Sequence, residues 1–547
     1  MSRVGLTKRT NERIELSEPV LHEERFHGHK TFAFANQSKS FTGRETLTKI
    51  IFEKSNGIDG INICDCDNDL SFIDEKFLRK TPLNLPQLSE LETLRHYKEL
   101  SDKNFCIEKG FYPLGSCTMK YNPKVNEMLA NLDGFANLHP LQSDEDSQGA
   151  LELMYKLQES LKEITGMPAI SLQPAAGAHG ELAGMMIIKN YFQSIGENRT
   201  KVIIPDSAHG TNPASAKMCG FECIEIKSNE KGQVDIDALK AVLDKDVAAI
   251  MMTNPNTLGL FEENILEISK IMHENGSLLY YDGANFNAIM GYTNPFLMGF
   301  DVVHINLHKT FSTPHGGGGP GAGPIGVVEK LKDFLPVPII DYIDTDANLR
   351  STFPNNYPSL AEGSKSLISG KGKYFRNYDL KNSIGKVKAF YGNFGVLVRA
   401  YAYILMMGKH LKNVSEDAVL NANYLKEKLK GAYELPYDYP CMHEFVLSGD
   451  KQKEQGASTL WIAKRLMDEN THPPTVYFPL IVHESIMIEP TETENKQTLD
   501  EFAEVMLKIA KEIEQSPEIA LKSPQKASVK KIDETLAARQ PDLKFKG

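Results

Sequence analysis

The chain has 547 residues, of which 41% are hydrophobic and 24% are charged, and its formal net charge is −11. This composition is typical of a folded globular protein and excludes wholesale disorder, while the length predicts a large domain with at least one smaller domain. An acidic chain without a block rich in Lys and Arg lacks the charge that binds phosphate backbones, so we expect no nucleic-acid partner.

The N-terminus and the apolar stretches of the chain predict no membrane association. The N-terminus alternates charges where a secretory signal needs an apolar run of about 7–15 residues. The most apolar stretch, Val396 to Met407, contains Arg399 and is shorter than the roughly 20 residues that a bilayer span needs. We therefore expect a cytoplasmic protein in which this stretch forms a core helix.

The cysteines indicate neither a disulfide framework nor a zinc site. Seven cysteines in a chain without an export signal predict reduced thiols. Cys64 and Cys66 are separated by one residue, and no second pair follows at zinc-site spacing, so we expect no metal.

In chain order, residues 1–45 are polar and predict a poorly ordered or partner-contacting arm. Residues 46–145 are expected to wrap the partner or the chain's own large domain, and Ser89 is placed to cap a helix there. Residues 391–520 begin with a long helix and continue with shorter strands such as 475–478 and 485–488, which predicts a smaller α+β domain. The lysine-rich residues 521–547 are expected to be a peripheral tail.

Residues 146–390 are expected to form a large α/β domain. Apolar residues recur at helical spacing before a stop at Gly166, and a second helix is expected from about Gly180 to Ser194. The expected strands, several of them near-continuous apolar runs, are 168–173, 201–205, 223–226, 247–253, 277–282 and 301–309. Such strands separated by helices indicate a mostly parallel sheet that is covered on both faces.

Three features of this domain point to one cofactor. The first is a turn of small residues, Gln173-Pro-Ala-Ala-Gly-Ala-His-Gly, between an expected strand and an expected helix. Small residues there let backbone N–H groups approach a phosphate, and the helix N-terminus adds a favourable partial charge. Taken alone, a turn of this kind more often only reverses the chain.

The other two features are an acid and a lysine, each at the end of an expected strand. Asp282 ends the apolar run 277–282, where a carboxylate can hold a pyridine nitrogen protonated. Lys309 ends the run 301–309, and a lysine between apolar walls can attack an aldehyde as the neutral amine. In isolation, each is as well explained by a solvated or capping side chain.

The phosphate turn, the acid and the lysine stand in the order found in the aspartate aminotransferase-like fold, fold type I of the pyridoxal 5'-phosphate (PLP) enzymes. This resemblance places His209, which follows the next strand after the turn, flat on one face of the cofactor, with Ala284 on the opposite face. A nucleotide loop at residues 316–323 is rejected, because the Gly-Lys-Ser/Thr ending is missing.

A more specific resemblance is to the decarboxylating glycine dehydrogenase, or P-protein, of the glycine cleavage system. The matching stretches are Phe111-Tyr-Pro-Leu-Gly-Ser-Cys-Thr-Met-Lys-Tyr-Asn-Pro, Gln173-Pro-Ala-Ala-Gly-Ala-His-Gly-Glu-Leu-Ala-Gly, Ser207-Ala-His-Gly-Thr-Asn-Pro-Ala-Ser-Ala, Asn306-Leu-His-Lys-Thr-Phe and Lys386-Val-Lys-Ala-Phe-Tyr-Gly-Asn-Phe-Gly. In that family only the second of two related halves keeps the Schiff-base lysine. A chain with Lys309 and about half the length of the long form therefore resembles subunit 2.

The resemblance implies that PLP is bound through Lys309 and Asp282, with Ala176, Gly177, His308 and Thr310 on the phosphate side. It also implies that glycine is decarboxylated, with release of CO2, and that the aminomethyl group passes to the lipoyl arm of a carrier, the H protein. A homologous lysine-free subunit 1 is the expected partner, in a heterotetramer with two copies of each chain. The chain alone is then expected to be inactive.

Several alternatives stay open. Another fold type I PLP enzyme, such as an aminotransferase or an amino-acid aldolase, would share the lysine, the acid and the turn, and a non-catalytic scaffold subunit would need none of them. The residue that binds the glycine carboxylate is not determined, because Arg350, Arg376 and Arg399 are all available. Cys117 is interpreted as a packed thiol in preference to a reactive one.

Overall fold

The computed structural model describes residues 6–10, 13–16, 73–78, 80, 88–314, 321–344, 372–527 and 532–543. The chain divides into two compact units, Met1–Phe105 with Ala527–Gly547, and Cys106–Lys526. The second, larger unit contains every predicted site residue. The five-part division that the sequence predicts stays a prediction.

The larger unit is built on a sheet that, within the described residues, has seven strands in the order β3-β9-β8-β7-β6-β4-β5. The strands are β3 (Ala169–Ser171), β4 (Lys201–Pro205), β5 (Glu222–Ile226), β6 (Val247–Thr253), β7 (Leu278–Gly283), β8 (Val302–Ile305) and β9 (Ile325–Val327). Strands β4 to β8 run parallel, and β9 runs antiparallel to its neighbours β3 and β8. The predicted mostly parallel sheet is confirmed.

Each face of the sheet has its own apolar core, because successive side chains of a strand point to opposite faces. On β7, Leu279 and Tyr281 belong to one core, and Leu278 and Tyr280 belong to the other. The first face is covered by α5 (Gln148–Thr165), α9 (Ile265–Glu274) and α11 (Phe394–Met407), and the second by α6 (Gly177–Ser194). Burial on both faces explains why these strands are near-continuous apolar runs.

The predicted site residues lie at the edge where the parallel strands end. His209 follows β4, Asp282 lies in β7, and Lys309 lies on the short helix α10 (Leu307–Thr310) that follows β8. Strand β3 runs in the same direction as β8, because both are antiparallel to β9, so the N-terminus of α6 faces this edge as well. Loops at the carboxyl edge of such a sheet are the usual place of a ligand site.

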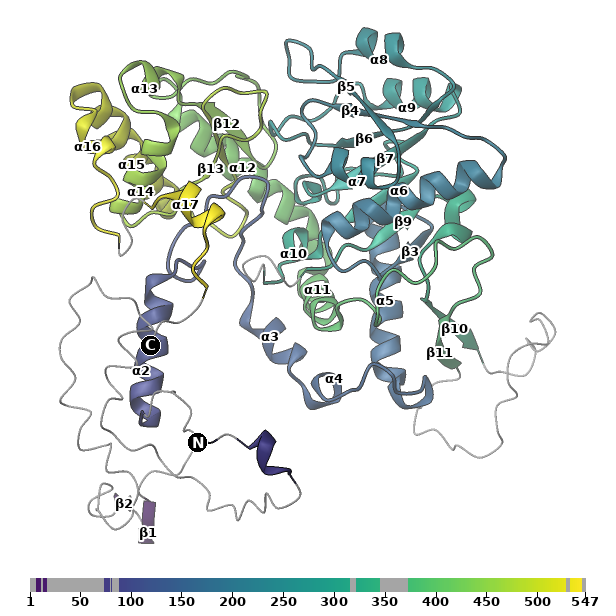
Figure 1. Cartoon of the computed structure of the whole chain (residues 1–547), viewed down its shortest axis with the longest axis horizontal. Helices are drawn as coiled ribbons and strands as arrows, with labels where there is room; N and C mark the ends of the chain where they lie inside the picture. Colours follow the sequence, from purple (N-terminus) through teal and green to yellow (C-terminus); the bar gives the residue numbers. More distant parts are fainter. Residues whose placement is uncertain are drawn as a thin grey trace. The chain divides into compact units, whose positions relative to one another are not determined.

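The C-terminal part of the larger unit forms a smaller lobe beside the large sheet, coloured green to yellow in Figure 1. Its antiparallel sheet has the order β12-β14-β13. The elements are β12 (Phe445–Ser448), β13 (Thr475–Val476), β14 (Ser485–Ile488), α12 (Leu411–Leu429), α13 (Asp450–Glu454), α14 (Thr459–Asp468), α15 (Lys496–Gln515) and α16 (Glu518–Leu521). Leu425, Ile486 and Phe502 share its core, which confirms the predicted α+β lobe.

Residues 111–123 run along the sheet of this lobe before they reach the site. Leu114 forms a bridge with Ile488, and the N–H of Gly115 donates to the backbone oxygen of Met487 (3.3 Å). A Cβ at Gly115 would lie 2.2 Å from the Met487 side chain, so this close approach requires glycine.

The remaining helices and strands of the larger unit connect these layers. They are α3 (Lys124–Ala130), α4 (Asp133–Ala136), η4 (Glu145–Ser147), α7 (Asn212–Met218), α8 (Ile236–Val242), η5 (Phe286–Ala288), η6 (Glu329–Phe334), β10 (Ile339–Asp344), β11 (Gly372–Asn377) and η7 (Gly408–His410). The core helix predicted for Val396 to Met407 is α11. Each helix in the described part of the chain is too short or too polar to span a bilayer.

The smaller unit contains the elements β1 (Leu6–Thr10), β2 (Arg13–Leu16), η3 (Glu75–Phe77), α2 (Glu90–Lys103) and α17 (Glu534–Arg539). Helix α2 begins with the predicted cap, because the Ser89 hydroxyl accepts from the Glu92 N–H and the Glu92 carboxylate accepts from the Ser89 N–H. Most of the predicted arm, residues 1–45, lies outside the described residues.

Four expected elements differ from the structure by two residues or more at one end, and one of them, strand 168–173, ends at Ser171. Strand 301–309 ends at Ile305, because the N–H of Thr310 donates to the oxygen of Asn306 (3.1 Å) and closes the short helix α10. Strand 475–478 ends at Val476, since Tyr477 has the left-handed φ of 58°. Helix α6 begins at Gly177, ahead of the expected Gly180.

Replacing Leu157 by alanine tests the packing of α5 against the large sheet. Leu157 is 0% exposed, so Leu157→Ala should lower the free energy of unfolding in urea by about 2–5 kcal/mol, through lost burial and a cavity. The matched control is Leu420→Ala, because Leu420 is 66% exposed and its change should stay within about 0.5 kcal/mol. Equal losses in the two variants would contradict this packing.

Candidate active site

Lys309 occupies the centre of the site. It is 7% exposed on α10, and the Nζ of Lys120 donates to the neighbouring backbone oxygen of Thr310 (3.1 Å). The Lys309 ammonium lies within electrostatic reach of Asp282 and His209. The structure therefore brings together the lysine, the acid and the histidine that the sequence singled out.

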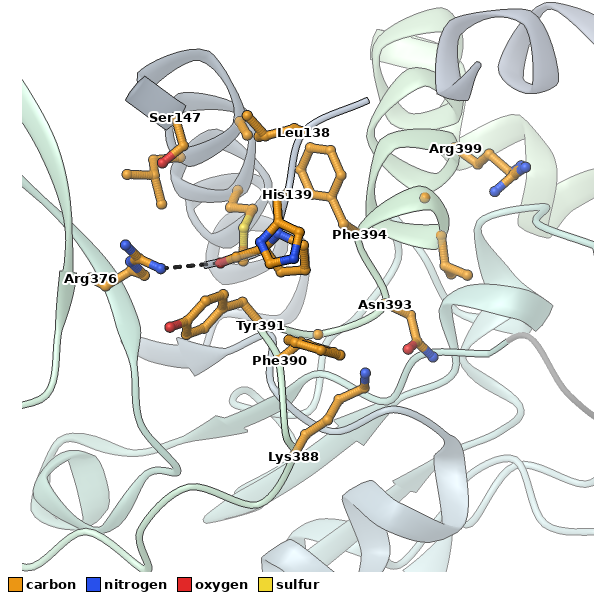
Figure 2. A pocket seen from close by; sticks show the side chains of 17 residues that line it. Leu138, His139, Ser147, Arg376, Lys388, Phe390, Tyr391, Asn393, Phe394 and Arg399 are labelled. Carbon is orange, nitrogen blue, oxygen red and sulfur yellow. Dashed lines mark hydrogen bonds between the residues drawn. The ribbon is translucent and has the colours of Figure 1, made fainter. Parts of the chain in front are cut away.

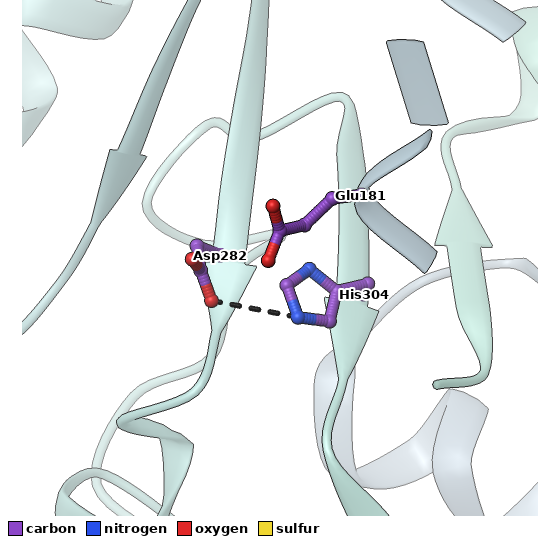
Figure 3. A group of neighbouring side chains, drawn as sticks. All are labelled: Glu181, Asp282 and His304. Atoms are coloured by element: carbon purple, nitrogen blue, oxygen red, sulfur yellow. Dashed lines mark ion pairs between the residues drawn. The ribbon is translucent and has the colours of Figure 1, made fainter. Parts of the chain in front are cut away.

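Asp282 is 1% exposed at the end of β7 and has three polar neighbours. Its Oδ1 accepts from the N–H of Ala284 (2.9 Å) and lies 3.4 Å from Nε2 of His304 on β8 (Figure 3). The Asn212 amide fits when its Nδ2 faces both nearby acids, donating to Oδ2 of Asp282 at 2.9 Å and to Oε2 of Glu181 at 3.2 Å. The carboxylate is thus fixed in one orientation.

The neighbouring carboxyl groups of Asp282 and Glu181 differ in charge. Burial raises the pKa of Asp282, but the nearby His304, His209 and Lys309 outweigh that effect and hold the pKa below its usual value. Burial, and then repulsion from Asp282, raise the pKa of Glu181 to about 8. At neutral pH Asp282 is therefore ionised and Glu181 carries the proton, as expected for two carboxyls that share a buried site.

Glu181→Gln should weaken the pH dependence of stability in the cofactor-free protein. A carboxyl whose folded pKa is raised favours folding below its unfolded pKa, and this contribution is lost as pH rises through the folded value. This stability should therefore be lost between pH 4.5, the ordinary pKa of a glutamate, and about pH 8, the pKa of the folded state. The midpoint temperature of thermal unfolding should decline less across that pH range for Glu181→Gln than for the wild type. A parallel decline in both would show that Glu181 is ionised throughout.

His209 is held by a segment that the sequence did not place here. Its Nε2 lies 2.9 Å from Oγ of Ser116, a hydrogen bond between residues 93 positions apart. Burial and the Lys309 ammonium lower the pKa of His209 to about 4, so the ring is neutral. Ala284, 2% exposed, follows Asp282 on the same strand end. Stacking of His209 and Ala284 on a cofactor stays a prediction.

The predicted phosphate turn packs tightly against α10. Within the described part of the chain, no side chain caps the N-terminus of α6, where Ala176 is the N-cap and Gly177 the first helical residue. A Cβ at Gly177 would lie 2.7 Å from the Asn306 side chain. Among the described residues, the buried Oγ1 of Thr310 has no hydrogen-bond partner. Free helix N–H groups and an unpartnered hydroxyl are donors suited to an anion.

Sequence reasoning missed the acids of the smaller lobe. Oε2 of Glu444 accepts from the N–H of Ser116 (2.7 Å), and its Oε1 accepts from Nδ2 of Asn285 (3.0 Å). Oε2 of Glu489 accepts from the N–H of Thr118 (2.9 Å). The left-handed φ values of Ser116 (62°) and Thr118 (47°) accompany these contacts. In the sequence, residues 111–123 stood out only through the family resemblance.

Two of the three arginine candidates for a substrate carboxylate are already paired. Arg376 pairs with Asp144, and Arg399 pairs with Glu127. Arg350 lies outside the described residues. Burial raises the pKa of Cys117, which favours the thiol and supports its interpretation as a packed residue. All five cysteines of the described residues are free thiols.

A pocket of about 480 Å³ is lined in part by residues 388 and 390–396, and Figure 2 shows the side chains around it. Phe390, Tyr391 and Phe394 supply apolar walls, and Lys388 supplies a cation. Asn393 joins the pocket to the turn, because its Nδ2 donates to the backbone oxygens of Ala175 (2.9 Å) and Gly321.

The sheet order, the C-terminal lobe and the lysine at the carboxyl edge define the class of fold type I PLP-dependent enzymes. A crystal structure of an inhibitor-bound glycine decarboxylase (P-protein) shares the fold, with TM-score 0.63, 17% identity, and 86% of this chain and 100% of that chain covered. A sphingosine-1-phosphate lyase of Burkholderia pseudomallei also shares it, with TM-score 0.56, 12% identity and coverages of 81% and 95%. At these identities the likeness establishes the fold.

The sequence identifies the family. Residues 63–353 match the family described as glycine cleavage system P-protein, and residues 414–531 match the glycine dehydrogenase C-terminal domain. A probable glycine dehydrogenase (decarboxylating) subunit 2 of Caldanaerobacter subterraneus is 57% identical, with 86% of this chain and 92% of that relative covered. Its counterpart in Listeria innocua is 56% identical, with coverages of 92% and 99%. The chain belongs to the glycine dehydrogenase (decarboxylating) subunit 2 family.

Proposed function

We propose that this chain is the PLP-dependent subunit of a glycine decarboxylase, which releases CO2 from glycine and passes the aminomethyl group to the lipoyl arm of a carrier H protein. The observation that carries the proposal is the convergence of Lys309, Asp282 and the uncapped N-terminus of α6 at one edge of the sheet. Membership of the glycine dehydrogenase family supports the choice of substrate.

The residues at this edge fit PLP. The cofactor needs an amine for its aldehyde, an acid for its ring nitrogen and donors for its phosphate. Lys309 offers the amine, and Asp282 offers an ionised carboxylate in a buried site. The N-terminus of α6 at Ala176 and Gly177, which no described side chain caps, offers backbone N–H groups, and the Thr310 hydroxyl, unpartnered among the described residues, offers a further donor.

Each of these residues then has a defined task. Lys309 would hold the cofactor covalently, and Asp282 would keep the ring nitrogen protonated. Ala176, Gly177, Thr310 and His308 would bind the phosphate. His209 and Ala284 would lie against opposite faces of the ring, and the bond from Ser116 fixes the His209 imidazole in place.

When bound, PLP supplies an electron sink for the electron pair that remains on glycine once CO2 departs. The protein supports this chemistry by orientation and by charge. The Asp282 carboxylate is held by Ala284 and Asn212, so its charge does not need to reorganise during the reaction. Burial of Lys309 and Asp282 keeps water away, which strengthens the electrostatic contacts.

We further propose that the chain acts in the cytoplasm with a homologous lysine-free subunit 1, two copies of each forming a heterotetramer. The name subunit 2 of its relatives implies a partner subunit. A site that admits a lipoyl arm and still excludes water gains from walls supplied by two chains.

Two measurements on the purified protein test this function. A visible absorption band of protein-bound PLP, shifted by glycine, is the expected result, and its absence would exclude the PLP enzyme. Exchange of labelled bicarbonate into glycine, with the lipoyl carrier and subunit 1 present, then distinguishes a decarboxylase from an aminotransferase. An aminotransferase would show the absorption band without the exchange.

The need for the partner is tested by omitting subunit 1 from the exchange assay. We expect the rate to fall to background, because the wall that subunit 1 supplies to the path of the lipoyl arm is then missing. Full activity of the chain with the carrier alone would refute the heterotetramer and favour a self-sufficient homodimer.

A further inference from the structure

Three ionisable groups of the smaller lobe form a buried cluster at the site, namely His443, Glu444 and Glu489. Each is 0% exposed. Nε2 of His443 lies 3.9 Å from Oε1 of Glu444 and 3.8 Å from Oε1 of Glu489, and one side-chain nitrogen or oxygen of each residue lies within 4.8 Å of those of the other two. The imidazole therefore stands between two carboxyl groups.

The hydrogen bonding of this cluster is incomplete. Neither ring nitrogen of His443 has a hydrogen-bond partner among the described residues, nor does Oε1 of Glu489. Burying unsatisfied polar groups costs about 1–3 kcal/mol each. A fold that keeps three such atoms together at a site indicates that they serve the reaction.

The cluster is connected to the reacting side of the site through residues 116–120. Glu444 accepts from the N–H of Ser116, whose hydroxyl bonds to His209, and Glu489 accepts from the N–H of Thr118. Lys120, 3% exposed, donates to the backbone oxygen of Thr310, beside Lys309. Among the described residues, the charged and titratable groups that face the cluster are Lys309, Lys120, Cys117 and Cys441.

Glu444 and Glu489 are wholly buried and lie beside the same imidazole, and two carboxyl groups so placed cannot both be ionised. Burial, and then repulsion from Glu489, raise the pKa of Glu444 well above its usual range. Burial also raises the pKa of Glu489 to about 7, although Thr118, Lys309 and Lys120 oppose the shift. Burial lowers the pKa of His443 to about 3, so the imidazole is neutral. At neutral pH Glu444 therefore keeps its proton, and the Glu489 carboxylate is the group of the cluster that can take up another.

The proposed reaction needs a group that accepts a proton and later returns it, because the reaction moves one proton without consuming it. Glycine enters with an ammonium group, and its amine must lose a proton before it can react. Later the aminomethyl carbon forms a bond with one sulfur of the lipoyl disulfide, the S–S bond breaks, and its electron pair leaves on the second sulfur. That sulfur needs one proton to become a thiol, so the proton given up by glycine balances the one taken up.

We propose that His443, Glu444 and Glu489 store this proton: the cluster accepts it from the ammonium of glycine and returns it to the sulfur released at the end of the reaction. The proposal rests on the proposed function. A store that is closed to water keeps the proton available for the sulfur through the steps between. His443 is a positioning residue, which keeps the two carboxyl groups apart and lets a single proton pass between them.

The first test uses infrared spectra of the cofactor-free chain and needs no activity. The C=O band of a protonated carboxyl should persist above pH 4.5, the ordinary pKa of a glutamate. It should lose intensity as pH rises through about 7, the pKa of Glu489. Glu489→Gln should remove that part of the band, while its amide oxygen can still accept from the Thr118 N–H. Glu444→Gln should also remove band intensity. Spectra of both variants that superimpose on the wild type would overturn the proposal.

The matched control is Glu484→Gln. Glu484 is another buried acid of the same lobe, 6% exposed, but it pairs with Lys453 (2.8 Å) and accepts from the N–H of Thr459 (2.8 Å). These contacts hold its pKa low against the effect of burial, so this variant should leave the band unchanged. Elemental analysis of the wild-type chain adds a second check, since a metal bound by the cluster would take the place of the proton and overturn the proposal.

The second test measures aminomethyl transfer to the lipoyl carrier in a single turnover, with subunit 1 present. The wild-type rate should rise as pH rises through about 7, the pKa of Glu489, because only the ionised carboxylate can accept the proton of glycine. Glu489→Gln should lower the rate about 10²–10⁴-fold and remove that pH dependence. Glu489→Asp should restore part of the rate and part of the pH dependence. Glu484→Gln should behave as the wild type. A wild-type rate in Glu489→Gln would overturn the proposal. No transfer by the wild type would refute the proposed function and leave the infrared result standing.

Discussion

Lys309→Ala should lower glycine-dependent bicarbonate exchange by about 10³-fold or more, on the order of the loss when an enzyme's covalent catalyst is removed. Lys309 is the buried amine at the carboxyl edge of the sheet, and alanine cannot form a covalent bond to PLP. The fold should stay intact, because the phosphate turn and both apolar cores are untouched. Borohydride reduction followed by mass spectrometry should find no cofactor attached to the variant.

The matched control for Lys309→Ala is Lys330→Ala. Lys330 follows β9 and pairs with Asp301 (2.8 Å), and its side chain is 46% exposed. Exchange activity and the reducible bond should both survive in this variant. A reducible bond at normal stoichiometry in Lys309→Ala would assign the covalent link to another lysine.

Asp282→Asn should slow decarboxylation about 10²–10³-fold, the usual effect of removing one preorganised electrostatic partner. The amide keeps the shape of the carboxylate but loses the charge that holds the ring nitrogen protonated. Contacts to Ala284 and Asn212 hold the carboxylate in one orientation, so the variant tests the loss of charge at a fixed position. Single-turnover release of CO2 from labelled glycine measures the effect.

The control for Asp282→Asn is Asp301→Asn at the other end of the sheet. Asp301 is 3% exposed, accepts from the N–H of Leu279 (3.0 Å) and pairs with Lys330. Its replacement should lower stability but leave the rate per folded molecule unchanged. An equal loss of rate in the two variants would mean that Asp282 acts only through the fold.

Much of the large domain follows from local sequence. The near-continuous apolar runs Lys201–Pro205 and Val247–Thr253 predicted two buried strands with the observed bounds. The Gly166 stop of α5 was also predictable, since the left-handed φ of 73° favours glycine. In both cases the signal lies within a few consecutive residues.

The positions of the turn, Asp282 and Lys309 were predictable for a related reason. Parallel strands end at one edge of a sheet, so residues at the ends of separate strands meet there wherever the sheet is parallel. The sequence itself therefore indicated which residues converge, although not that Lys309 lies on a short helix. Closure of that helix depends on the bond from the Thr310 N–H to Asn306, which no strand pattern reveals.

Only the tertiary structure decided what surrounds that edge. The contact between Ser116 and Glu444 joins residues 328 positions apart, and it forms because residues 111–123 run along the sheet of the smaller lobe. Periodicity and capping signals extend over a few residues and carry no information on such a pairing. Sequence alone thus predicted most strands of the large sheet, the fold class and the position of Lys309 at its carboxyl edge, while tertiary packing decided that Glu444, Glu489 and His443 meet in a buried cluster.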